Sequence, residues 1–172
     1  QTFQTTPLIK KEGYEIALGN FFGLEGHPIP GVSLPGFENM VQYPKLGMPW
    51  GEDGCVMNAK DFGAHCCITL QDIWNMDMNT MNQVKNWIPI IPIDHEPPNP
   101  DTLERLKLAY RIVSITRHGE NALREHGFSS TYIPHTVNTN LYQPLNQEEC
   151  RKVINIPEDI YLVSLVGDNK QV

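Results

Sequence analysis

Between residues 65 and 166 the sequence alternates short, almost uniformly apolar runs with longer polar segments of helical length. The apolar runs are residues 65–70, 87–93, 110–115, 130–133 and 160–166. Strands that are apolar along their whole length are typical of parallel sheets buried on both faces, and parallel strands need crossover segments between them. Because the intervening segments are long enough to be helices, the pattern predicts an α/β fold with a doubly wound, mostly parallel sheet.

The polar segments carry signals for helix starts and stops. Thr116 precedes a helix expected to reach about His126, and Gly127 stands where a left-handed residue closes such a helix. Asp101 is expected to cap a helix over residues 102–108, with Glu104 completing a capping box. The other expected helices cover residues 1–11, 52–62, 78–86 and 148–153, and two earlier strands are expected at 14–22 and 43–48.

The last apolar run, Ile160–Val166, is continuous enough for a strand buried on both faces, yet only six residues follow it. A doubly covered strand needs neighbours, so we expect this run to open a second, truncated domain. The polar, turn-rich segment 134–146 is the best boundary candidate. The prediction is therefore one domain over residues 1–137 whose first strand is missing, followed by a linker and the start of another domain over residues 138–172.

Charge and composition limit the classes of partner. The formal net charge is −7, from 13 basic and 20 acidic residues, and Lys and Arg are scattered, which disfavours a nucleic-acid surface or a polybasic membrane patch. No apolar run approaches the 18 or so residues of a transmembrane helix. Peripheral contact with a membrane stays open.

The four cysteines are Cys55, Cys66, Cys67 and Cys150. Cys66 and Cys67 are adjacent, so on a strand they point to opposite faces and cannot chelate one ion together. The sequence contains no C-x-x-C motif and no visible secretory leader. This usage is typical of reduced thiols in a cytoplasmic protein.

The sharpest local signal for chemistry is Asp94-His95-Glu96, which directly follows a hydrophobic strand. In doubly wound sheets, ligands bind at the carboxyl ends of the strands. A carboxylate there can accept protons from sugar hydroxyls, and the histidine can donate or accept according to its tautomer. The alternative is that Asp94 caps the turn and the other two side chains are solvated. Joint ligation of a metal is disfavoured, because consecutive residues rarely converge on one ion.

Other polar residues follow the remaining strands. Asp72 and Trp74 could bind the hydroxyls and stack on the face of a sugar, although Trp74 could equally cover the core. Arg117 and His118 lie in the first turn of an expected helix, where an anion can dock; the alternatives are an acidic neighbour or plain solvation. His135 follows the strand at 130–133. His65 opens a strand and is expected to be a buried structural histidine.

Several familiar motifs are absent. The sequence has no G-x-x-x-x-G-K-[ST], no G-x-G-x-x-G and no G-x-S-x-G. Their absence weakens nucleotide hydrolase, nicotinamide dehydrogenase and esterase interpretations. A glycine loop could have belonged to the missing first strand, so the dehydrogenase stays open.

Several short segments, taken together in their order along the chain, indicate a family resemblance that no single motif establishes. The segments are ITLQDIW at 68–74, IPIIPIDHEP at 88–97, the Thr116-led helix, Pro134-His135-Thr136-Val137-Asn138, Tyr142-Gln143-Pro144 and Ile156-Pro157-Glu158-Asp159. This succession resembles the group 1 (family 4) retaining glycosyltransferases, and the opening QTFQTTPLIKKEGYEI resembles the helix after that family's glycine loop. Thr136 and Asn138 depart from the family's usual glycine and aspartate.

The resemblance implies a GT-B fold, in which two Rossmann-like halves face each other and bind a nucleotide-sugar donor between them, with no cofactor and no obligatory metal. This chain would be the N-terminal, acceptor-side half and the entry into the donor half. By position, Asp94 or His95 matches the family residue that reaches toward the transferred sugar. Lys170 lies where the family gathers diphosphate-binding groups. The family's basic pair and E-x7-E carboxylates would lie beyond Val172, so the fragment is expected to be inactive alone.

The prediction is therefore a fragment of a retaining glycosyltransferase that moves a sugar from a nucleotide-sugar to an unknown acceptor. Its expected catalytic residues are Asp94 and His95, and its expected substrate-binding residues are Asp72, Trp74, Glu96, Arg117, His135 and Lys170. The main alternative is a non-catalytic α/β module that binds a sugar or nucleotide. Another two-domain enzyme, such as a nucleotide-sugar epimerase, is the third hypothesis.

Overall fold

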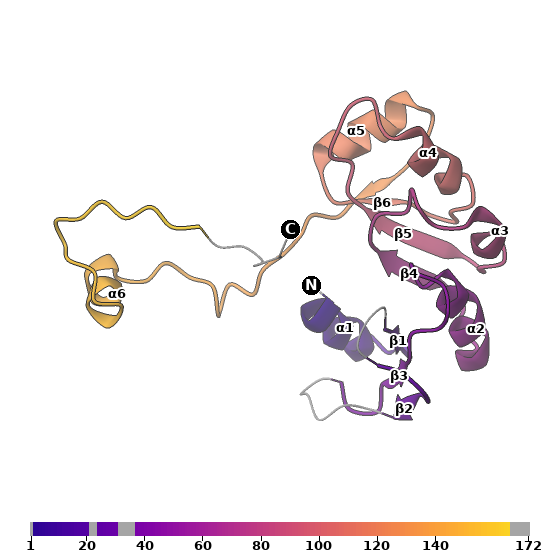
Figure 1. Cartoon of the computed structure of the whole chain (residues 1–172), viewed down its shortest axis with the longest axis horizontal. Coiled ribbons are helices and arrows are strands. Elements are labelled where there is room, and N and C mark those ends of the chain that lie inside the picture. Colours follow the sequence, from indigo (N-terminus) through magenta and orange to yellow (C-terminus); the bar gives the residue numbers. More distant parts are fainter. Residues whose placement is uncertain (1, 21–23, 31–36, 166–172) are drawn as a thin grey trace. The chain divides into compact units, whose positions relative to one another are not determined.

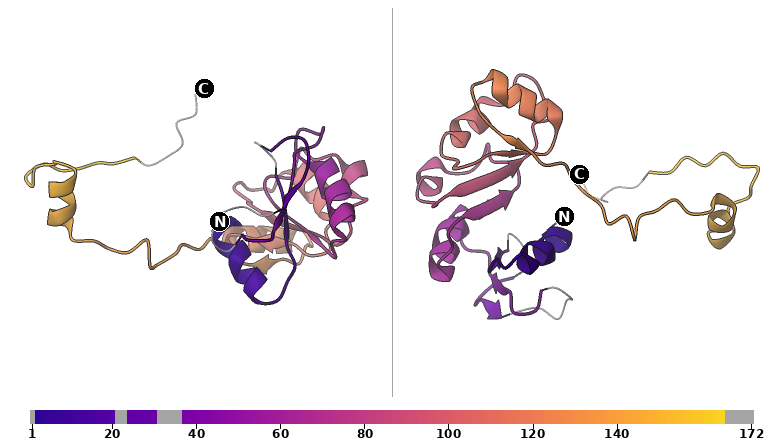
Figure 2. Two further views of the ribbon diagram at one scale, coloured as in Figure 1. Left: turned by 90° about the horizontal axis from the view of Figure 1, so that it is seen from below. Right: turned by 180° about the vertical axis from the view of Figure 1, so that it is seen from behind.

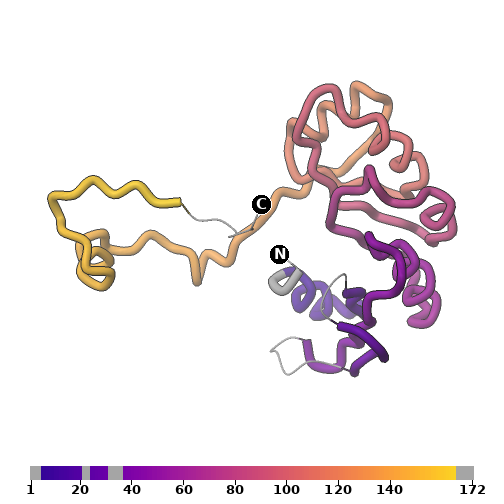
Figure 3. Tube along the Cα trace, in the orientation of Figure 1, coloured from indigo at the N-terminus to yellow at the C-terminus, as the bar shows by residue number. Residues whose placement is uncertain are grey.

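The computed structural model describes residues 2–20, 24–30 and 37–165. The chain divides into two units, Gln1–Thr136 and Val137–Val172, and each is described here by itself. The elements are labelled in Figure 1, and Figure 2 gives two further views of them. The path of the chain can be followed in Figure 3.

The first unit is built on a four-stranded parallel sheet in the order β4-β5-β6-β7. The strands are β4 (Cys67–Leu70), β5 (Trp87–Ile91), β6 (Val113–Ser114) and β7 (Thr131–Tyr132). Helices α3 (Met78–Met81), α4 (Pro100–Leu106) and α5 (Arg117–Glu125) connect them in turn. The expected α/β fold with parallel strands is confirmed. Strand order never reverses within this sheet, so the reversal that defines a doubly wound sheet stays a prediction.

One buried cluster joins this sheet to its three crossover helices. Trp87 and Ile91 of β5, Met81 of α3, Leu106 of α4 and Leu123 of α5 are all 2% exposed or less. The indole nitrogen of Trp87 donates a hydrogen bond to the Thr69 hydroxyl at 3.0 Å, which satisfies both polar groups inside this core. The cluster therefore fixes the positions from which the loops at the end of each strand depart.

Strand β4 is buried on one face only, although its sequence is mostly apolar. Its alternate residues Ile68 and Leu70 are 54% and 44% exposed, whereas Thr69 faces the core at 8%. Strand β4 is the edge of its sheet, and successive side chains of a strand point to opposite faces. His65, expected to be a buried structural histidine, is exposed and precedes the strand. Its carbonyl accepts a hydrogen bond from the Asn86 side chain at 2.8 Å.

A second sheet lies earlier in the sequence, in the order β1-β3-β2. Strand β1 (Ala17–Gly19) runs parallel to β3 (Val41–Tyr43), and β2 (Ile29–Pro30) runs antiparallel to it. A strand was expected over residues 43–48, but the observed strand β3 covers Val41–Tyr43 and so shares only Tyr43 with that range. Strand β2 was not expected from the loop-like composition around it. Pro30 fits there because β2 is an edge strand, where a residue without an N–H is tolerated.

Local chemistry predicts two helices well. Helix α2 (Glu52–Phe62) has the expected bounds and closes on Gly63, whose φ is +71°. In α5, the Thr116 hydroxyl accepts a hydrogen bond from the backbone N–H of Gly119 at 2.9 Å. Gly127 follows with φ +83°, the left-handed conformation expected of it. Helix α1 (Thr2–Lys11) also forms, with Pro7 inside it.

Replacing Thr116 with alanine is expected to lower the free energy of unfolding by about 1 kcal/mol, because the N–H of Gly119 loses its acceptor. Thr116→Ser keeps the hydroxyl and is expected to remain within about 0.5 kcal/mol of the parent. Urea unfolding followed by circular dichroism measures both. Equal losses for the two variants would contradict the cap.

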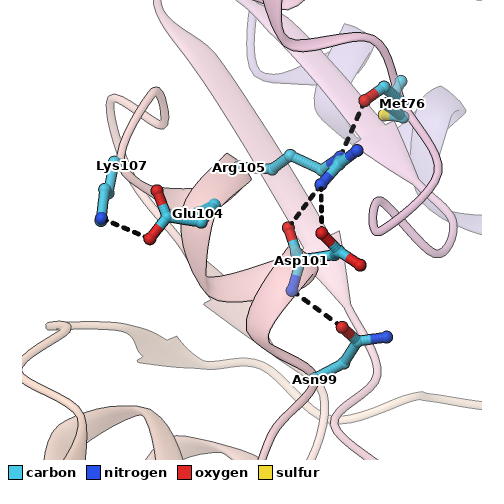
Figure 4. Close-up of polar contacts among 6 residues, drawn as sticks. All are labelled: Met76, Asn99, Asp101, Glu104, Arg105 and Lys107. Atoms are coloured by element: carbon cyan, nitrogen blue, oxygen red, sulfur yellow. Dashed lines mark hydrogen bonds and ion pairs between the residues drawn. The ribbon is translucent and has the colours of Figure 1, made fainter.

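The expected cap of α4 is wrong by two residues. Asn99 caps the helix through its side-chain oxygen, which accepts the Asp101 N–H at 2.8 Å (Figure 4). Pro100 takes the first helical position. Proline is favoured there because its missing N–H would be unpaired anyway. Glu104 pairs with Lys107 at 2.5 Å instead of completing a capping box. Arg105 donates from Nε to the Met76 carbonyl at 2.7 Å, which ties α4 to the segment before α3.

The second unit contains helix α6 (Gln147–Val153), capped by the Asn146 side chain, which accepts the Glu149 N–H at 3.0 Å. The strand expected at Ile160–Val166 is not formed over residues 160–165, and Val166 lies outside the described residues. Residues 160–165 are exposed, and Leu165 is 98% exposed. A strand needs a neighbour for its backbone hydrogen bonds, and the described part of this unit contains no strand to supply one.

Among the residues that the structure describes, no helix combines the length and the apolar character needed to cross a bilayer.

Candidate functional site

Because the strands are parallel, their carboxyl ends all lie on the same side of the sheet, which we call the carboxyl edge. The pairing register shows which positions in the following loops are level with one another. Ile91 pairs with Ser114, and Ser114 pairs with Tyr132. Asp94, Arg117 and His135 each come three residues after one of these mutually paired positions. The sheet therefore delivers three predicted site residues to the same edge. Asp72 and Trp74 follow β4, whose Leu70 pairs with Ile90 of β5.

Asp94 and His95 form a hydrogen-bonded pair on the loop that follows β5. Nδ1 of His95 lies 2.7 Å from Oδ1 of Asp94, and the two side chains are 60% and 80% exposed, respectively. An ionised carboxylate can only accept, so Nδ1–H of His95 is the donor. In the tautomer that carries its proton on Nδ1, Nε2 can accept a further hydrogen bond. The hydrogen bond from His95 lowers the pKa of Asp94 below its ordinary value of 3.8. The pair therefore presents an imidazole nitrogen backed by a carboxylate.

Replacing His95 with alanine is expected to raise the pKa of Asp94 back toward 3.8, because its main cause of lowering is removed. A folded-state pKa below the unfolded value means that the pair stabilises the fold at neutral pH. That contribution is lost as the pH falls through the lowered pKa. Carbon NMR of the Asp94 carboxyl across pH 2–6 measures it. An unchanged midpoint in His95→Ala would contradict the pair, and Glu125→Ala, at the far end of α5, is the control.

Arg117 is the first residue of α5, and its charge is already partnered. Its guanidinium stacks over the Tyr132 ring at 4.1 Å, and Nη1 lies 2.7 Å from Oε2 of Glu120. Glu120 is the acidic neighbour that the sequence left as one alternative for this cationic turn. An anion bound here would share Arg117 with Glu120, since the guanidinium has further N–H donors. Sequence reasoning missed Glu120 and Tyr132; the i,i+3 spacing of Arg117 and Glu120 could have indicated the first of them.

The remaining predicted residues are exposed where the structure describes them. Trp74 is 47% exposed, while its neighbour Ile73 is buried at 1%, so the indole is not one of the buried core residues. Asp72, Glu96 and His135 are also exposed. Lys170 lies outside the described residues. Asp94, Glu96, Arg117 and His135 therefore all follow the carboxyl ends of neighbouring strands.

A hollow of about 210 Å³ in the first unit is lined by residues 109–112 and 129–131, at the amino ends of β6 and β7. That hollow contains none of the predicted site residues. In the described part of the chain, no group of three His, Cys, Asp or Glu side chains is arranged to hold a metal ion.

Comparisons of the chain with protein-family models, with curated proteins and with solved structures found no match.

Proposed function

We propose that this chain is the acceptor-side part of a retaining glycosyltransferase, which moves a sugar from a nucleotide-sugar donor to an acceptor hydroxyl. Two independent features support the proposal. The first is the ordered succession of segments from residue 68 to residue 159, quoted above. The second is the four-stranded parallel sheet, whose carboxyl edge carries polar side chains suited to sugar recognition.

The observation that carries the proposal is the Asp94–His95 pair. It follows a buried strand, at a turn that needs no ionisable side chains, and both groups face solvent. Nε2 of His95 can accept a hydrogen bond from a sugar hydroxyl while Asp94 fixes the ring through Nδ1. In this proposal, the pair orients a hydroxyl of the sugar or of the acceptor at the reacting centre.

Departure of a nucleoside diphosphate leaves negative charge on phosphate oxygens, while the sugar ring gains oxocarbenium character. Arg117 follows β6, the strand that pairs with β5 before the Asp94 loop, and its guanidinium pairs with Glu120. The proposal assigns Arg117 to the substrate's polar groups and Trp74 to the face of a sugar ring. The proposal assigns most of the diphosphate charge to the donor-binding half that the family resemblance implies.

The test is a panel of nucleotide-sugars offered, with mixed acceptor sugars, to the protein encoded by the full reading frame that contains this sequence. Expected results are release of the nucleoside diphosphate and a glycoside with the donor's anomeric configuration, read by proton NMR. Chain 1–172 assayed alone is expected to show no turnover. Tight binding of a nucleotide-sugar without any transfer or hydrolysis would favour the non-catalytic binding module, and an inverted product would overturn the retaining mechanism.

A further inference from the structure

The first turn of α5 packs closely against the ends of two strands. Gly119, the third residue of this helix, is buried. A β-carbon added to Gly119 would lie 2.6 Å from Oγ of Ser114 and 3.1 Å from Cβ of Ile93. Ser114 is the last residue of β6, and Ile93 lies two residues beyond the end of β5. The absence of a side chain at residue 119 therefore lets the helix approach both strand ends.

The atoms around Gly119 are held in place. Ser114 is completely buried, and its hydroxyl donates to the Thr116 carbonyl at 2.9 Å. The same carbonyl accepts the N–H of Glu120 at 3.0 Å. Ile93 is 7% exposed and belongs to the hydrophobic cluster of the sheet. Moving a contact from 2.6 Å to an ordinary 3.4 Å takes about 0.8 Å, and we expect the helical turn, rather than these core residues, to move.

Backbone conformation gives no reason for a glycine at this position. Gly119 is not among the glycines with positive φ, and alanine is favoured over glycine within helices. Gly54 provides a matched comparison, because it is the third residue of α2. A β-carbon at Gly54 would meet Nδ2 of Asn58 at 3.3 Å, at the end of a longer side chain. Steric crowding therefore distinguishes Gly119 from Gly54.

The close approach at Gly119 links two parts of the candidate site. Arg117 lies two residues before Gly119 in the same helical turn. Asp94 directly follows Ile93, which the added β-carbon would crowd. Strand pairing shows only that the loops after β5 and β6 are neighbours. The packing of Gly119 sets how far the turn that carries Arg117 stands from the start of the Asp94 loop.

We propose that Gly119 is a positioning residue for the candidate site, an inference that rests on the proposed function. Its missing side chain seats the first turn of α5 on Ile93 and Ser114, so that Arg117 and the Asp94 loop contact the same substrate. A hydrogen bond spans about 2.7–3.2 Å, so a displacement of about 0.8 Å is enough to break one. Gly119 itself offers no side chain to the substrate and acts through Arg117.

The first test needs no reaction and uses NMR of chain 1–172. The parent is expected to show a nuclear Overhauser effect between the α protons of Gly119 and the side chain of Ile93. Gly119→Ala is expected to shift the amide signals of residues 93–95 and 114–117, whereas Gly54→Ala leaves them in place. An absent Overhauser effect in the parent, or equal shifts in the two variants, would overturn the proposal.

A second variant tests the steric cause and protects against a Gly119→Ala chain that folds poorly. Ser114→Ala removes the oxygen that the added methyl group would meet at 2.6 Å. Gly119→Ala is expected to lower the urea midpoint clearly less in the Ser114→Ala background than in the parent, because contacting residues are not additive. An equal loss in both backgrounds would rule out the crowding at Ser114 as the cause.

Kinetics of the full-length protein separate positioning from stability. If it carries out the proposed transfer, Gly119→Ala is expected to raise KM for the nucleotide-sugar at least about tenfold, the scale of a lost hydrogen bond to a charged group. A merely less stable enzyme would lose active molecules and show a lower apparent kcat at unchanged KM. Gly54→Ala is expected to keep both parent values.

An unchanged KM in Gly119→Ala would overturn the positioning role. If the parent full-length protein transfers no sugar, the proposed function fails instead. The NMR comparison of chain 1–172 would then still decide whether Gly119 seats the first turn of α5 on the strand ends.

Discussion

Replacing Trp87 with alanine is expected to lower the free energy of unfolding by about 3–5 kcal/mol. Trp87 is completely buried as the first residue of β5, within the cluster that holds the sheet to its three crossover helices. The truncation leaves a cavity and also deprives the Thr69 hydroxyl of its indole donor. Because small domains are stabilised by only about 5–15 kcal/mol, a loss of this size is expected to unfold much of the first unit at 37 °C.

Urea unfolding followed by circular dichroism measures this loss, and two variants calibrate it. Trp87→Phe keeps most of the apolar volume and is expected to cost clearly less than Trp87→Ala. Trp74→Ala removes an indole that is 47% exposed and is expected to cost less than about 1 kcal/mol. A Trp87→Ala variant as stable as Trp74→Ala would show that β5 is not the centre of this core.

The second large effect concerns Asp94 and His95, and it rests on the proposed transfer reaction. If the full-length protein carries out the proposed transfer, Asp94→Asn and His95→Ala are each expected to lower kcat about 100-fold or more, the usual scale for a positioned acid–base group. Asp94→Asn preserves shape but gives Nδ1 of His95 a neutral partner, which weakens the charge-assisted hydrogen bond now spanning 2.7 Å. Initial-rate measurements of nucleoside diphosphate release give kcat and KM separately.

Glu125→Gln is the matched control for these variants. Glu125 is an exposed carboxylate at the last position of α5, away from the loops that follow the strands, and its replacement is expected to leave kcat unchanged. Asp94→Asn should also change the acid limb of the pH–rate profile, because the group with the lowered pKa is gone. Wild-type rates in both Asp94→Asn and His95→Ala would remove these side chains from the mechanism, whereas failure of the full-length protein to transfer sugar would remove the proposed function itself.

Local chemistry accounts for the elements that were predicted correctly. The hydroxyl of Thr116 and the glycine at 127 bracket α5, and both act on backbone groups within a few residues of themselves. The prediction that Asp101 caps α4 was wrong, and the reason is also local. Asn99 and Asp101 are both good capping residues, and the choice fell to Asn99 because Pro100 fits the first helical position.

Other errors have a non-local origin. Apolar sequence runs do not reveal which strand lies at the edge of a sheet, so the exposure of Ile68 and Leu70 on β4 was missed. The run at 160–166 has strong strand propensity, yet residues 160–165 form none, since pairing requires a second strand. Propensity describes a residue's own backbone, whereas a strand's hydrogen bonds belong to two segments.

The sequence alone determined that strands and helices alternate after residue 65 and that charged side chains stand at the strand ends, because both depend on the order of neighbouring residues. Only the tertiary structure decided which strands lie side by side, and therefore which of the following loops are neighbours. The register of β5, β6 and β7 places Asp94, Arg117 and His135 at equal distances along the chain from mutually paired residues. Strand pairing joins segments that are far apart in the sequence, so spacing along the chain cannot set it.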